Sequence, residues 1–177
     1  MLNIGFILSN VSLGWSEAFL LYKNGFMRWE DFIEIAHDRL NNGSDNSLEI
    51  DLIVIGTSNV WQTLEIVEEL AEGKEASADE IREKWLFLNL LWAYENRSDS
   101  DPLYEDALSE VEGIADDFGL PDTIRSFVRY APPDPEDEYQ PSCHSLKENR
   151  ERMMSKWAQY LEETRKHFNR STPYCQM

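Results

Sequence analysis

Residues 85–94 read WLFLNLLWAY, and this stretch decides the fold class of the chain. Its apolar side chains are distributed all round a helix rather than along one stripe, which is typical of a helix that is buried on every side. Upstream, Ser77 and Glu80 form an S-x-x-E capping box, a signal for a helix N-terminus. We therefore expect a helix over 81–94 that is the central and most buried element of the protein.

Other helices are expected on both sides of this element. Gly25 and Asn41-Asn42-Gly43-Ser44 are stop signals, and Asp101-Pro102 and the Ser145/Glu148 capping box are start signals. The expected helices cover residues 12–24, 29–40, 61–71, 102–118, 121–129 and 145–168. The sequence thus predicts a mostly α-helical protein, built as an antiparallel helical bundle or as stacked helix pairs.

One segment is ambiguous. Residues 48–55, LEIDLIVI, suit a strand by their Ile and Val content and a short buried helix almost as well. Residues 3–8, NIGFIL, are the one segment that could pair with it as a short β-hairpin near the N-terminus. We favour a helix for 48–55, because the chain contains no convincing partner strand, and we keep the hairpin as the alternative.

Composition divides the chain into three parts. A helical core domain is expected over 1–130, followed by an acidic, proline-rich loop over 131–144. A C-terminal helical segment, 145–177, is expected to pack on the core. A total of 177 residues with 42% hydrophobic side chains is enough for one such core.

Negative charge is concentrated in the middle of the sequence. The chain has 34 acidic and 16 basic side chains, a formal net charge of −18, and residues 99–138 contain thirteen acids but only two bases. This balance disfavours nucleic acid and anionic membranes as partners and favours a basic protein. The alternative is internal charge balance, because residues 147–170 carry seven bases and four acids and could lie against the acidic middle.

The sequence favours a cytoplasmic protein. The apolar residues 1–8 lack the basic start and the length of a secretory signal. No stretch approaches the ~20 apolar residues that span a bilayer. Cys143 and Cys175 flank the last helix, so we expect both to be free thiols, as in a reducing compartment.

No motif for catalysis or for a cofactor is visible. His37, His144 and His167 are each better explained as surface or helix-end histidines than as ligands or general bases. The DPEDE run at 134–138 lacks the spacing of a calcium loop, and no nucleotide-binding glycine pattern occurs. We therefore expect a non-catalytic protein with no metal and no cofactor.

A family resemblance is carried by residues 11–40, VSLGWSEAFLLYKNGFMRWEDFIEIAHDRL, and by residues 85–96, WLFLNLLWAYEN. These stretches resemble a bacterial family catalogued as domain of unknown function 2247, over the chain up to about Arg129. Small acidic members of such families resemble immunity proteins, which accompany secreted bacterial toxins, many of them basic nucleases. The resemblance implies a bound and neutralised toxin, and it implies no site residues.

The leading hypothesis is an acidic binding protein, an immunity protein that neutralises a basic toxin domain such as a nuclease. Its contact surface is expected to combine acidic side chains with tyrosine anchors: Asp99, Asp101, Tyr104, Asp134, Glu136, Asp137, Glu138 and Tyr139. A structural or adaptor protein with a helical binding groove is the first alternative. A metal-dependent hydrolase built on scattered carboxylates is the second.

Overall fold

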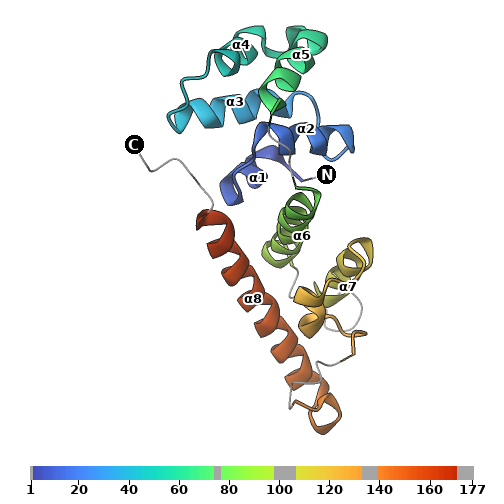
Figure 1. Ribbon diagram of the computed structural model, residues 1–177. Helices are drawn as coiled ribbons and strands as arrows, with labels where there is room; N and C mark the ends of the chain where they lie inside the picture. The colour runs from blue at the N-terminus through green and yellow to red at the C-terminus, as the bar shows by residue number, and fades with distance from the viewer. Residues whose placement is uncertain (1, 74–76, 98–106, 133–138, 171–177) are drawn as a thin grey trace. The chain divides into compact units, whose positions relative to one another are not determined.

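The computed structural model describes residues 2–73, 77–97, 107–132 and 139–170. Within these ranges the regular elements are all helical and no strand occurs, which confirms the mostly α class (Figure 1). The chain divides into two compact units, unit 1 within residues 1–84 and unit 2 within residues 85–170. The organisation into 1–130, 131–144 and 145–177 stays a prediction, because these units do not test it.

Unit 1 contains α1 (Ile4–Asn10), α2 (Trp15–Lys23), α3 (Asp31–Asn41), α4 (Ser47–Ile55), the 3-10 turn η1 (Gly56–Ser58) and α5 (Val60–Ala71). Figure 1 shows α4 and α5 beside α3 and α2: α3 contacts α4, α2 contacts α5, and α4 contacts α5. The fully buried side chains at the centre of this unit include Ile7, Ala18, Phe32, Ile35 and Leu52.

The predicted helix over 48–55 is confirmed as α4, and the alternative N-terminal hairpin is wrong. Residues 4–10 form α1, and the Asn3 side chain accepts a hydrogen bond from the Gly5 N–H at 2.8 Å as its N-cap. Asn46 caps α4 in the same way, accepting from the Leu48 N–H at 3.0 Å. Asparagine at the N-cap satisfies a backbone donor that would otherwise lack a partner, and it favours a helix start where the apolar pattern alone is ambiguous.

Helix α6 (Ala78–Glu95) begins in unit 1 and ends in unit 2. Its buried side chains lie all round the helix, as expected, and are Ile81, Lys84, Trp85, Leu86, Phe87, Leu88, Leu90, Leu91 and Ala93. The Glu80 N–H donates to the Ser77 hydroxyl at 3.3 Å, so the predicted serine cap is present. The lysine among these residues is neutralised: Nζ of Lys84 lies 2.5 Å from Oε1 of Glu17 in α2.

Unit 2 continues with α7 (Ala107–Asp117), the 3-10 segment η2 (Asp122–Phe127), the 3-10 turn η3 (Pro141–Cys143) and α8 (Leu146–Arg170). The segment expected as a helix over 121–129 is therefore shorter and 3-10 in form. Aromatic rings join these elements: Trp157 of α8 packs against Tyr94 of α6 with ring centroids 5.0 Å apart and against Phe127 of η2 at 6.4 Å. None of the helices in the described ranges combines the length and the apolar character needed to cross a membrane.

Candidate functional site

Three large apolar side chains on consecutive elements of unit 1 are exposed. Val54 near the end of α4 is 79% exposed, Trp61 in the first turn of α5 is 77% exposed, and Ile50 of α4 is 48% exposed. Single exposed apolar side chains are ordinary, but three within twelve residues, one of them a tryptophan, are typical of a binding surface.

Only acidic charge accompanies these side chains in the sequence. From residue 40 to residue 73 there are seven acids and neither lysine nor arginine. Six of the seven are exposed, and with Ile50, Val54 and Trp61 they define what we call the α4–α5 surface: Asp45, Asp51, Glu65, Glu68, Glu69 and Glu72. A surface of one sign with apolar side chains attracts a partner of the opposite sign and can then bury apolar area against it.

The local sequence explains why these side chains face solvent. Helix α4 is apolar on all sides, and its contacts with α3 and α5 bury Leu52 but leave Ile50 and Val54, four residues apart, on an open side. Gly56 has φ +53°, a left-handed conformation that glycine adopts without steric cost, and it ends α4. Asn59 caps α5, accepting from the Gln62 N–H at 3.3 Å, and so fixes the turn that carries Trp61.

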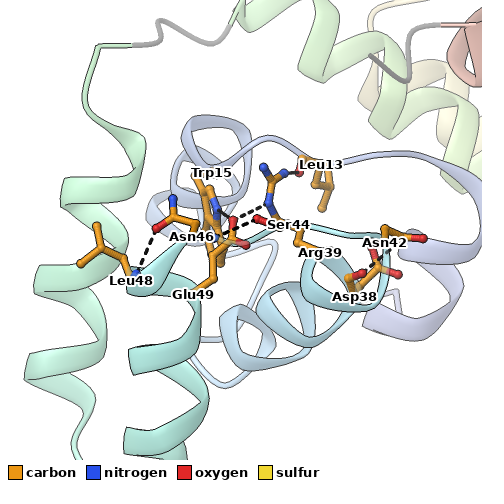
Figure 2. A network of polar contacts seen from close by, with 9 residues as sticks. All are labelled: Leu13, Trp15, Asp38, Arg39, Asn42, Ser44, Asn46, Leu48 and Glu49. Atoms are coloured by element: carbon orange, nitrogen blue, oxygen red, sulfur yellow. Dashed lines mark hydrogen bonds and ion pairs between the residues drawn. The ribbon is translucent and has the colours of Figure 1, made fainter. Parts of the chain in front are cut away.

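The remaining acid of this segment, Glu49, belongs to α4, and its buried side chain fixes this helix to its neighbours (Figure 2). Oε1 of Glu49 accepts hydrogen bonds from Nε1 of Trp15 at 2.8 Å and from Nε of Arg39 at 2.7 Å. Arg39 also donates from Nη1 to the Leu13 carbonyl at 3.2 Å. Burial by itself raises the pKa of Glu49, but hydrogen bonds from Ser44, Trp15 and Arg39 and the charge of Arg39 outweigh it and leave this pKa below 4.5. Glu49 is therefore a structural carboxylate that anchors α4, α3 and the start of α2.

Most of the contact residues predicted from the sequence lie outside the described residues. These are Asp99, Asp101, Tyr104, Asp134, Glu136, Asp137 and Glu138, and their role stays a prediction. Tyr139 is described and lies in unit 2, where its ring stacks on His144 with centroids 4.3 Å apart and Cζ of Arg152 lies 4.0 Å from its centre.

Among the described residues, the histidines do not converge on one another or on a carboxylate cluster. His37 and His167 are exposed on α3 and α8, and His144 lies against Tyr139. Cys143 is an exposed free thiol. In the ranges that the structure describes, no group of three or more histidine, cysteine or acidic side chains is arranged to hold a metal ion.

The α4–α5 surface was missed in the sequence reasoning, although a signal for it exists. That signal is the absence of any lysine or arginine over residues 40–73, which is less conspicuous than the dense acids at 99–138. Which apolar side chains of 48–55 face solvent depends on the contacts of α4 with α3 and α5, and these contacts are not encoded in the periodicity of a helix that is apolar on every side.

Comparison with known families bears on most of the chain. Residues 4–165 match the model of a family described as "Uncharacterized protein conserved in bacteria (DUF2247)". The chain belongs to this family. The match extends past Arg129, where the resemblance was expected to end, and includes most of α8. No curated protein and no solved structure gives a significant match to this DUF2247 chain.

Proposed function

We propose that this DUF2247 protein is a non-catalytic, acidic binding protein of the bacterial cytoplasm, an immunity protein that neutralises a basic toxin domain. The observation that carries the proposal is the α4–α5 surface, on which six exposed carboxylates accompany exposed Ile50, Val54 and Trp61 in a segment, residues 40–73, that contains no lysine or arginine. A toxin that acts on nucleic acid presents cations at its active site, and such a surface complements them.

Charge and apolar area contribute differently to this binding. The carboxylates accelerate the encounter and select a basic partner, while affinity comes from the side chains that lose water on contact. Tryptophan is one of the residues most often found at the energetic centre of an interface, where its truncation costs ~2 kcal/mol or more. Trp61 is therefore the expected anchor, and Val54, which is exposed to a similar degree, is expected to contribute a second apolar contact.

The first experiment is capture from a lysate of the source bacterium at low salt, followed by mass spectrometry. Three variant baits are compared with the wild type. The first combines Trp61→Ala with Val54→Ser, and the second combines Glu65→Lys, Glu68→Lys and Glu69→Lys. The third reverses the charge at Asp99, Asp101, Asp134 and Glu136. The control reverses exposed acids of α8, Glu151→Lys with Glu163→Lys. A basic protein retained by the wild type and the control but lost from the first two baits is the expected result.

A second experiment tests neutralisation directly. The captured basic domain is expressed in a heterologous bacterium with and without this protein, and growth is measured. Restored growth with the wild type but not with Trp61→Ala and Val54→Ser is expected. If the domain is toxic and the wild type gives no protection, the protein is no immunity protein, and if all baits retain the same basic proteins, the α4–α5 surface does not select a partner.

An adaptor that binds an apolar helix is the second candidate, and the exposure of Ile50, Val54 and Trp61 is the observation that favours it. It differs from the first candidate in the contribution of charge. Reversal of Glu65, Glu68 and Glu69 abolishes retention of a basic partner but leaves an apolar helix bound, so the second bait distinguishes the two functions.

A further inference from the structure

The exposed side chains of α4 and of α5 each form one stripe at helical spacing. The stripe of α4 is mostly apolar and consists of Ser47, Ile50, Asp51 and Val54. The stripe of α5 begins with an aromatic ring and continues with carboxylates: Trp61, Gln62, Glu65, Glu68 and Glu69. Helix α4 packs on α3 and α5 packs on α2, so each stripe lies on a side that these contacts leave open (Figure 1). The α4–α5 surface therefore combines an apolar stripe with an acidic one.

The carboxylates of α5 have no counter-ion among the described residues. Within the described ranges no ion pair involves Glu65, Glu68 or Glu69, whereas Glu17 of α2, for example, is paired with Lys84. Like charges three or four residues apart on a helix repel one another and destabilise it. A row of cations placed along α5 relieves this repulsion, so charge complementarity favours a basic partner at this stripe.

The spacing of the carboxylates matches a helix better than an extended segment. Glu65 and Glu69 are one turn apart, about 5.4 Å along the axis, and lysines or arginines on a second helix repeat at the same interval. Side chains on one side of an extended strand repeat about every 6.6 Å, so a strand loses register over the ~18 Å length of the 12-residue α5. The described ranges also contain no strand, and hence no sheet edge that a partner strand could extend.

We infer that the segment of the partner that binds the α4–α5 surface is a basic amphipathic helix of about three turns. Its apolar side chains cover Ile50, Val54 and Trp61, and its lysines or arginines, three or four residues apart, face Glu65 and Glu68. The inference rests on the proposed function and deepens it, because it names the element of the basic partner that makes the contact. Active-site cations carried on a helix satisfy it, whereas an extended basic tail does not.

The test uses the full chain and three synthetic peptides about 14 residues long. The first consists of leucine and lysine placed so that each covers one side of a helix. The second has the same composition in alternating order, the period of a strand, and the third is the first with glutamate in place of lysine. Fluorescence anisotropy of labelled peptide at low salt measures binding, and NMR of ¹³C-labelled peptide measures the helix content of the bound state. The helical lysine peptide should bind at least about tenfold more tightly than either of the others and be helical in the complex.

Variants of the protein locate the binding. Trp61→Ala should weaken binding of the helical lysine peptide about thirtyfold, and its 77% exposure means that the loss does not reflect unfolding. Glu65→Gln with Glu68→Gln should weaken it about tenfold at low salt and less as salt is raised. The matched control, Glu151→Gln with Glu163→Gln, removes two exposed carboxylates from α8 and should leave binding unchanged.

Four results overturn the inference: no binding of the helical lysine peptide, equal binding of the alternating peptide, a bound peptide that is not helical, or an equal loss in the α8 control. Equal binding of the glutamate peptide also overturns it, and the surface then accepts any apolar helix, as an adaptor does. The proposed function fails by a different result, a toxic partner against which the wild type gives no protection. The two failures are therefore distinguishable.

Discussion

Arg39 of α3 donates its Nε–H to Oε1 of Glu49 of α4 at 2.7 Å, and the Glu49 side chain is only 1% exposed. This pair joins α3 to α4 through two residues that are ten apart in the sequence, and its carboxylate is buried. A buried ion pair adds little when it replaces two apolar side chains, but removal of one partner leaves the other charge buried and uncompensated. The pair therefore makes unit 1 sensitive to single substitutions.

Glu49→Gln should lower the free energy of unfolding by about 3 kcal/mol, because the amide leaves the Arg39 charge without its counter-ion. The free energy of unfolding is measured by urea titration, with circular dichroism as the signal. The matched control is Glu34→Gln on the exposed side of α3, which should change stability by less than about 0.5 kcal/mol. Equal effects of the two substitutions would contradict the role given to this pair.

Acid should destabilise the wild type more steeply than Glu49→Gln. The pKa of Glu49 in the folded protein is below its ordinary value of 4.5, because three hydrogen bonds and Arg39 together outweigh burial. A lowered pKa stabilises the fold above the unfolded value, and that stabilisation is lost as pH falls through the folded pKa. Unfolding curves from about pH 7 to about pH 3 should therefore converge for the two proteins at the acid end. Parallel curves would show that Glu49 contributes nothing.

Substitution of two buried tryptophans by phenylalanine should lower the stability of the protein by different amounts. The indole N–H of Trp15 donates to Glu49, whereas the buried N–H of Trp157 has no hydrogen-bond partner among the described residues. Trp15→Phe should cost about 1–2 kcal/mol more than Trp157→Phe, since only the first loses a hydrogen bond to a charged group. Chemical unfolding of both variants measures this difference in the free energy of unfolding. A larger loss for Trp157→Phe would indicate a bound water on that N–H.

The cap of α5 should be worth about 1 kcal/mol. Asn59→Ala removes the acceptor for the Gln62 N–H, while Asn59→Asp keeps one. We expect a lower unfolding midpoint for alanine and near wild-type stability for aspartate. If alanine is neutral, the start of α5 is held by its contacts with α2 and α4 instead.

Binding of the proposed basic partner should weaken as salt is raised. Exposed carboxylates act over a distance that salt shortens, so the association rate should fall between low salt and about 0.5 M, while Trp61→Ala should mainly raise the dissociation rate. Surface plasmon resonance with the captured partner separates the two rates. An association rate that does not change with salt concentration would favour the adaptor function.

The helix pattern was predictable because stop and start signals agreed with the apolar pattern. Gly25 and Gly43 follow α2 and α3 with positive φ, and the Ser145 cap of α8 is present, with Glu148 accepting from the Ser145 N–H at 2.8 Å. Residues 48–55 stayed ambiguous because a helix that is apolar on all sides has no periodicity to distinguish it from a buried strand.

The site was less predictable than the fold. Glu49 resembles a solvent-facing acid in the sequence, and its burial depends on Trp15 and Arg39, which lie 34 and 10 residues away. Tyr139 follows an acidic run in the sequence, yet the structure places it against Arg152. Three-dimensional neighbours determine these environments, and local composition does not.

The carboxylates around Ile50, Val54 and Trp61 also govern how copies of this protein behave toward one another. In dilute buffer their like charges should keep two such surfaces apart, so we expect no self-association through the exposed Trp61. Concentrated salt removes that repulsion and strengthens apolar contact at the same time. The protein should therefore stay in solution best in low-salt buffer near neutral pH. In ammonium sulfate, the first contacts between copies should form through the α4–α5 surface.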